Sequence, residues 1–129
     1  MTSRRWVVLS ICLALVGLVP PPRAGAVDAE RAARRQQMIE KAVSFLGTKA
    51  QAADGSFNAQ AGPAVTALVT TGLLRNGRSP EEPLVAKALR YLEKFVQPDG
   101  GIYAEGTSNK NYETCIALVC FQEANRNGK

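Results

Sequence analysis

Acid–base and metal chemistry have few candidate side chains in this sequence. None of the 129 residues is histidine, which excludes the Ser-His-Asp and Cys-His systems that activate a nucleophile and disfavours most zinc sites. Asp28, Asp54 and Asp99 are widely separated. Cys115 and Cys120 lie in a segment with helical spacing, so we expect packed thiols, the alternative being an exported thiol that pairs between chains. We expect no catalytic motif, no metal and no cofactor.

One cluster of polar and aromatic residues occurs twice. A helix end is followed by a glutamine, an Asp-Gly turn and an aromatic residue, first within residues 45–57 and again within residues 91–103. The motif residues are Gln51, Asp54, Gly55 and Phe57 in the first copy, and Gln97, Asp99, Gly100, Gly101 and Tyr103 in the second. The glutamines are 46 positions apart and the aspartates 45. A period of this size is typical of helical repeats.

The composition of this motif favours a structural role. Glycine can adopt a positive φ and aspartate can hydrogen-bond the local backbone. A glutamine amide can satisfy polar groups at a helix end while the aromatic residue covers it. We therefore interpret Gln51 and Gln97 as structural rather than catalytic.

The elements that position the two motifs are predicted to be helices. Residues 28–46 predict an amphipathic helix whose apolar side runs from Met38 to Leu46. Residues 79–96 predict a second one, opened by a capping box in which Ser79 is followed by Glu82. Residues 63–76 and 113–124 are apolar nearly all round. Helices of that kind must be buried on most sides.

Each amphipathic helix is followed by an apolar one, so the sequence predicts two helical hairpins, at about residues 35–77 and about residues 79–125. Segments 41–46 and 87–92 align, and segments 67–69 and 117–119 align at an offset of 50. Outer amphipathic helices over inner apolar helices make an all-α, curved double layer. Two hairpins cannot cover inner helices this apolar. We therefore expect further repeats, or another copy of the chain, as partners.

The N-terminal 26 residues have the three parts of a secretory signal peptide. Arg4 and Arg5 precede an apolar run over residues 7–19, which is shorter than the roughly 20 residues of a membrane span. Residues 24–26, Ala-Gly-Ala, form a cleavage site, so we expect export, cleavage after Ala26 and a mature domain over residues 27–129. An uncleaved membrane anchor is the alternative.

Removal of this leader changes the charge of the chain. Three of the 16 basic residues, Arg4, Arg5 and Arg23, lie in it, but none of the 11 acidic residues does, so the mature chain carries +2. A nearly balanced domain has no electrostatic footprint for nucleic acid or for an anionic membrane.

The repeated residues resemble the prenyltransferase and squalene cyclase superfamily, a terpenoid cyclase-like fold that builds α/α toroids from helical hairpins. The resemblance covers about residues 35–125 in two units, and is carried by Phe45-Leu46, Gln51, Asp54-Gly55 and Phe57, and by Tyr91-Leu92, Gln97, Asp99-Gly100-Gly101 and Tyr103. It implies two repeats of a toroid, here an incomplete ring. In that family the glutamine and an aromatic residue, typically tryptophan, clamp adjacent helices.

The catalytic residues of that superfamily do not carry over to this chain. The sequence has no Asp-x-Asp-Asp motif of the cyclases, no histidine for the zinc site of the protein prenyltransferases and no Gly-Cys-x-Glu-Gln sequence of the thioester domains. The resemblance places the N-termini of the inner helices at a central cavity, which makes Thr66, Tyr112, Glu113 and Cys115 candidate cavity residues. Glu113 could donate a proton or contact a ligand, but we favour an acidic residue placed at a positive helix end.

Two functions are consistent with these residues. The first is an exported, non-catalytic repeat module that acts as a scaffold or binds a partner or an apolar ligand on its inner face. The alternative is the N-terminal part of a longer exported terpene cyclase or transferase-like enzyme, whose catalytic residues would lie beyond Lys129.

Overall fold

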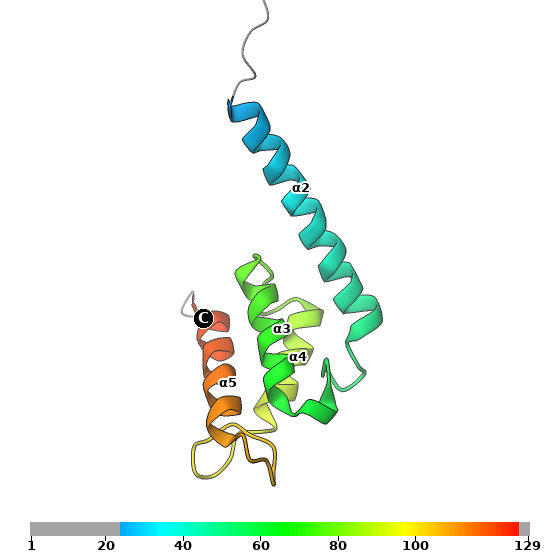
Figure 1. Ribbon diagram of the computed structural model, residues 1–129. Coiled ribbons are helices and arrows are strands. Elements are labelled where there is room, and N and C mark those ends of the chain that lie inside the picture. The colour runs from blue at the N-terminus through cyan, green and yellow to red at the C-terminus, as the bar shows by residue number, and fades with distance from the viewer. Residues whose placement is uncertain (1–23, 127–129) are drawn as a thin grey trace, which may run out of the picture. The chain divides into compact units, whose positions relative to one another are not determined.

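A computed structural model describes residues 24–126 of the chain, and these residues are all-helical (Figure 1). The elements are α2 (Ala24–Phe45), a π-helical turn (Leu46–Ala50), a 3₁₀ turn (Ala59–Ala61), α3 (Pro63–Arg75), α4 (Pro83–Glu93) and α5 (Lys110–Ala124). The predicted all-α class is confirmed for this part of the chain. Residues 1–23 of the expected 26-residue leader lie outside the described residues, so export and cleavage after Ala26 stay predictions.

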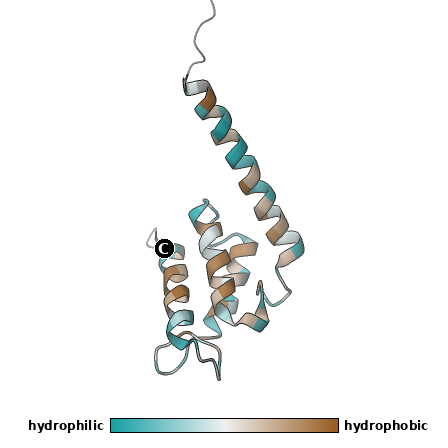
Figure 2. Ribbon diagram, in the orientation of Figure 1, coloured by the Kyte–Doolittle hydropathy of each residue, from teal (hydrophilic) through white to brown (hydrophobic). Residues whose placement is uncertain are grey.

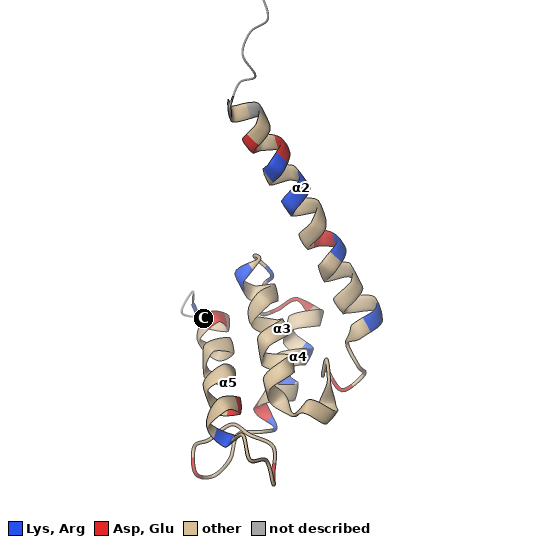
Figure 3. Ribbon diagram, viewed as in Figure 1, with Lys and Arg blue, Asp and Glu red and all other residues tan. Residues whose placement is uncertain are grey.

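Helix α2 is divided between two compact units of the chain, with the boundary between Gln37 and Met38. In the first unit, the described side chains from Val27 to Gln37 are all exposed, and Figure 3 shows charged residues along this part of the helix. The second unit contains the end of α2 and all of α3, α4 and α5. It carries both turn motifs and every candidate site residue.

Helix α3 is the centre of the second unit, because α4 and α5 both pack against it. Helices α3 and α5 run parallel. At their first ends Gly62 approaches the carboxylate of Glu113, and at their last ends Arg75 Nε donates to Glu123 Oε1 at 2.8 Å. Apolar residues predominate on both helices (Figure 2). This side-by-side pair is the frame on which the candidate site is built.

The hydrophobic core lies where α3, α4, α5 and the second turn meet. Its buried members are Ala67, Tyr91, Leu92, Ile102, Ala117 and Cys120. Tyr91 and Phe95 pack with ring centroids 5.0 Å apart. Burial of this kind stabilises by about 25 cal/mol per Å² of apolar area, so the core holds the second motif turn, through Ile102, against the helices.

Three helix starts differ from the sequence prediction. Helix α2 begins at Ala24, before Asp28, and α5 begins at Lys110, before Glu113. Helix α4 begins at Pro83, and only one half of the capping box forms, as the Ser79 N–H donates to Glu82 Oε1 at 3.0 Å. The Ser79 hydroxyl instead bonds the Glu81 carboxylate. Proline at the first helical position, where an N–H is not needed, determines the start of α4.

The apolar side of α2 is less buried than its pattern predicts. Met38 is 58% exposed and Phe45 is 60% exposed, whereas only Ile39, Val43 and Leu46 are half-buried. The physical reason is that no described element covers the side of α2 that carries Met38 and Phe45. Tyr91, which aligns with Phe45, is 5% exposed because it lies in the core.

Candidate binding surface

The first motif turn is fastened to the start of α4. Gln51 Nε2 donates to the Leu84 carbonyl at 2.8 Å and more weakly to the Gly55 carbonyl at 3.3 Å. Asp54 Oδ1 accepts the Ser56 N–H at 3.0 Å and the Ser56 hydroxyl at 2.7 Å, and these bonds hold the pKa of Asp54 below its usual value. Gln51 and Asp54 thus satisfy backbone and hydroxyl groups, which is a structural arrangement.

The second motif turn is fastened to its own aromatic residue. The Tyr103 hydroxyl donates to Asp99 Oδ2 at 2.6 Å, and the Gly101 N–H donates to Asp99 Oδ1 at 2.9 Å. These bonds, the tyrosine bond first, lower the pKa of Asp99, and the same carboxylate raises the pKa of Tyr103. Gln97 Nε2 donates to the Tyr103 carbonyl at 2.9 Å. The glutamine here closes its own turn instead of reaching another helix.

The hydrogen bonds show that the two turns repeat with an offset of 45 and not 46. In the first, Ala52 N–H donates to the Ser56 carbonyl, and in the second Gln97 N–H donates to the Gly101 carbonyl, each at 2.8 Å. Gln97 is therefore the counterpart of Ala52, which corrects the pairing of the two glutamines made from sequence. By the same offset the counterpart of Phe57 is Ile102, not Tyr103.

On each neighbouring helix, a threonine hydroxyl accepts a backbone N–H from one of these turns. The Phe57 N–H donates to Thr66 Oγ1 at 3.1 Å, and the Ile102 N–H donates to Thr114 Oγ1 at 3.0 Å. Thr66 is fully buried, so this candidate cavity residue has a structural bond in place of a ligand. Sequence reasoning missed Thr114. The sequence pattern that could have identified it is a threonine after each Asp-Gly turn. The two threonines do not align, because the second loop is longer.

Glu113 is a buried anchor for the loop that follows the second turn. The residue is 4% exposed. Its Oε2 accepts the Ala104 N–H at 2.8 Å and its Oε1 accepts the Thr107 hydroxyl at 2.9 Å. It also lies in the first turn of α5, where a negative charge is favourable. Both carboxylate oxygens therefore have protein partners. The geometry supports a structural role for Glu113, which holds this loop in place.

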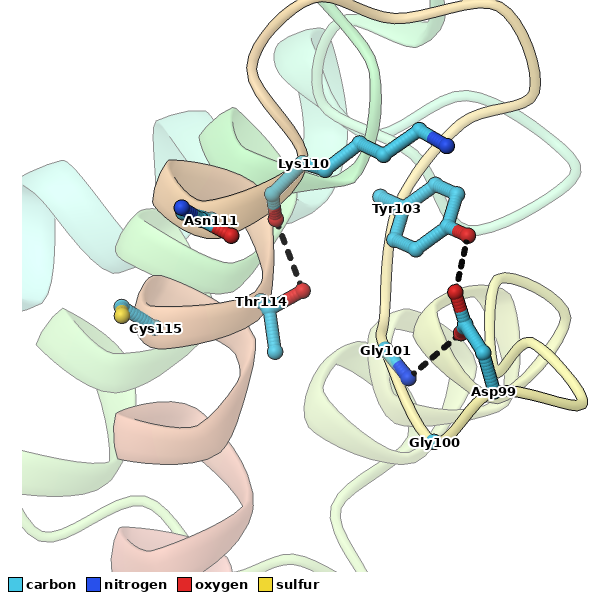
Figure 4. Close-up of a pocket in the computed structure, with 8 residues that line it drawn as sticks. All are labelled: Asp99, Gly100, Gly101, Tyr103, Lys110, Asn111, Thr114 and Cys115. Carbon is cyan, nitrogen blue, oxygen red and sulfur yellow. Dashed lines mark hydrogen bonds between the residues drawn. The ribbon is translucent and has the colours of Figure 1, made fainter.

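A hollow of about 410 Å³ lies between the second turn and the start of α5 (Figure 4). The Lys110 ammonium stands over the Tyr103 ring, 4.6 Å from its centroid, and the Thr114 hydroxyl donates to the Lys110 carbonyl at 2.7 Å. The polar side chains that line the hollow thus interact with one another: Asp99 bonds Tyr103, and Lys110 contacts the Tyr103 ring. Cys115 is exposed at the border of this hollow, and Cys120 is buried, which raises the pKa of its thiol to about 11.

Exposed apolar side chains gather on the uncovered sides of α3 and α5. Tyr112 is 54% exposed, Leu118 55% and Val119 40%, and Leu68 on the neighbouring helix is 48% exposed. Tyr112, Cys115 and Val119 follow one another at helical spacing and so share one stripe of α5. We call Leu68, Tyr112, Cys115, Leu118 and Val119 the α3–α5 apolar face. Two of the four cavity candidates, Tyr112 and Cys115, lie on it; Thr66 and Glu113 are buried elsewhere.

Metal and membrane sites find no support in the part of the chain that the structure describes. No three His, Cys, Asp or Glu side chains of residues 24–126 come together as ligands for a metal ion. None of the helices in that range is both long and apolar enough to cross a bilayer.

No family model, no curated protein and no solved structure matches this chain. The resemblance to the prenyltransferase and squalene cyclase superfamily therefore stays a prediction from the repeated residues.

Proposed function

We propose that this chain is a non-catalytic helical module that binds an apolar surface of another polypeptide through the α3–α5 apolar face. The observation that carries the proposal is the exposure of Leu118, Val119 and Leu68 on two helices that pack side by side. Exposed large apolar side chains on neighbouring helices are of the kind that line interaction sites. Helices and their grooves commonly receive such partners through residues spaced by three and four positions.

The polar groups of the two turns support the same proposal. Asp54, Asp99 and Glu113 each accept hydrogen bonds from protein donors, so the acidic residues near α3 and α5 fasten loops. These bonds fix the turns and the following loop beside two parallel helices whose exposed sides carry apolar groups. Such a surface can contact an apolar surface of another polypeptide.

The proposal can be tested with the full chain and a fluorescent apolar probe, 8-anilinonaphthalene-1-sulfonate. We expect probe emission to rise with wild-type protein, and sedimentation to show association at higher concentration. Val119→Asp and Leu118→Asp should each reduce both signals at least threefold. Val96→Asp is the matched control, because Val96 is 54% exposed but lies outside the α3–α5 apolar face. A probe-silent monomer, or equal losses for all three variants, contradicts the proposal.

A further inference from the structure

Helices α3 and α5 are equivalent elements of the two helical hairpins. Thr66 and Thr114, which accept the corresponding N–H groups of the two turns, are 48 positions apart. This offset replaces the value of 50 predicted from the sequence. Residues of α3 and α5 that are 48 positions apart can therefore be compared directly, and a difference in their burial shows which helix is covered at that position.

Residues that are buried on α3 have exposed equivalents on α5. Ala67, Thr70 and Thr71 are buried, and α4 and α5 both pack against α3. Their equivalents on α5 are Cys115, Leu118 and Val119, all of them exposed. We call these three residues the tail surface. It is the counterpart of a side that, one hairpin earlier, receives two helices.

The relationship is reversed in the first hairpin. Cys120 on α5 is fully buried, but its equivalent on α3, Gly72, is exposed, and so is Leu68 one turn earlier. On the amphipathic helices, Tyr91 is buried whereas Phe45, which aligns with it, is exposed. We call Phe45, Leu68 and Gly72 the head surface. It lacks the cover that α3 gives to the equivalent residues of the second hairpin.

Contacts inside the chain show how a tail surface and a head surface fit together. Across the contact between α3 and α5, Cys120 hydrogen-bonds Thr71. The equivalent of Thr71 is Val119 on the tail surface, and that of Cys120 is Gly72 on the head surface. A second copy placed on α5 as α5 is placed on α3 therefore brings its Gly72 against Val119. Neither side chain has a polar atom, so this contact leaves no buried polar group without a partner.

An apolar cleft of about 270 Å³ lies at the head surface, between the end of α2 and α3. Two of its lining residues are Leu46 and Val69. Their equivalents in the second hairpin, Leu92 and Ala117, are buried in the core with Ala67 of α3. The space that α3 fills beside the second hairpin is thus open beside the first. The element equivalent to α3 is α5, so α5 of a second copy fits this space.

Opposite charges also stay in register in such a contact. Within one chain Arg75 of α3 pairs with Glu123 of α5, with Nε and Oε1 2.8 Å apart. These two residues are themselves equivalents, 48 positions apart. A second copy on α5 therefore places its Arg75 beside Glu123, and the pair recurs between copies. Exposed pairs of this kind add little affinity, but they favour one register over another.

We propose that the tail surface of one copy binds the head surface of a second copy, so that the second copy lies on α5 as α5 lies on α3. The proposal rests on the function proposed above and names the partner of the α3–α5 apolar face as another molecule of this chain. Leu68 and the α5 residues of that face then lie on opposite sides of the contact. Because the contact joins two different surfaces, association continues beyond two copies into a ring or an open filament.

The test uses two variants of the full chain, each with one damaged surface. Leu118→Asp damages the tail surface and Leu68→Asp the head surface, and both positions are exposed, so each variant should fold. Alone, each should associate roughly tenfold more weakly than wild type in sedimentation velocity. An equimolar mixture should form a complex of two copies and nothing larger, because one intact tail surface meets one intact head surface. Val96→Asp, which changes neither surface, should associate as wild type does.

Cross-linking locates the contact independently. In a Cys115→Ser background, a copy with Gly72→Cys and a copy with Val119→Cys should form a disulfide dimer on oxidation, measured on a non-reducing gel. Replacement of the second copy by one with Val96→Cys should lower the yield roughly tenfold. Copies with Val119→Cys alone should not pair with one another.

Three results overturn the proposal: wild type that stops at two copies, variants that do not restore association when mixed, or cross-links between two Val119→Cys copies. The outcomes also separate this proposal from the proposed function. A chain that binds the apolar probe through Leu118 and Val119 but stays monomeric refutes a second copy as the partner and leaves the proposed function standing. A probe-silent monomer refutes both.

Discussion

Gly55 faces the backbone carbonyl of Lys87 so closely that a Cβ built on it would lie 2.3 Å from that oxygen. The contact joins the first motif turn to the middle of α4, and Gly55 also has a φ of +98°. Both the space and the backbone conformation therefore require glycine at this position. This close packing of the first turn against α4 supports a structural role for the repeated turns.

Gly55→Ala should lower the free energy of unfolding by about 3 kcal/mol, from steric overlap and from an unfavourable positive φ. The matched control is Gly100→Ala. Gly100 has a φ of +88° but nothing within 4 Å of a built Cβ, so its cost should be about 1 kcal/mol. Urea denaturation of both variants measures the difference. Equal losses would show that the contact with Lys87 contributes nothing.

Glu113→Ala should lower the free energy of unfolding by about 2 kcal/mol, because it leaves the Ala104 N–H and the Thr107 hydroxyl without their acceptor. Glu113→Gln should cost less than half as much. The amide oxygen can accept the Ala104 N–H, and the Thr107 hydroxyl can rotate to accept from the amide nitrogen. Equilibrium unfolding compares the two variants. A Gln variant as unstable as the Ala variant would indicate that the negative charge itself is required.

The stability difference between wild type and Asp54→Asn should depend on pH. The pKa of Asp54 is lowered in the folded state from 3.8 by its bonds from Ser56. A lowered folded pKa contributes stability that is present above the unfolded pKa and is lost as the pH falls through the folded value. The wild type should thus exceed Asp54→Asn in melting temperature between pH 5 and 7, by a margin that narrows below about pH 4. A margin that is constant down to pH 2 would contradict this.

Native alkylation should distinguish Cys115 from Cys120. Cys115 is exposed, whereas burial raises the pKa of the Cys120 thiol to about 11. At pH 8 the thiolate is the reactive form, so iodoacetamide should modify Cys115 at least tenfold faster than Cys120. Peptide mapping by mass spectrometry measures both rates in one sample, and the two rates should converge in 6 M guanidinium. Equal native rates would show that α5 is not held against the core as described.

Regular features of the fold could be predicted from the sequence because local patterns determine them. The helical segments and the use of Asp54 and Asp99 as turn residues follow from spacing and turn chemistry. The exposure of Phe45 could not be predicted in this way. Its pattern matches that of Tyr91, but exposure depends on whether another element covers the helix, and the periodicity of one segment does not contain that information.

The offset of the repeat shows a similar limit. The two glutamines suggested an alignment of Gln51 with Gln97. The backbone hydrogen bonds instead align Ala52 with Gln97. The roles of Thr66 and Thr114 were likewise hidden, because loops of different length separate each threonine from its turn.

The second connection shows how a longer loop can be accommodated without disturbing the helices around it. From Phe57 to Thr66 the chain takes 9 positions, but from Ile102 to Thr114 it takes 12. The additional length lies in the part of the chain whose backbone and hydroxyl bond to Glu113. The longer loop and the Glu113 carboxylate that binds it therefore belong together. A loop of another length could replace this one if the replacement kept a carboxylate at the start of α5 to bind it.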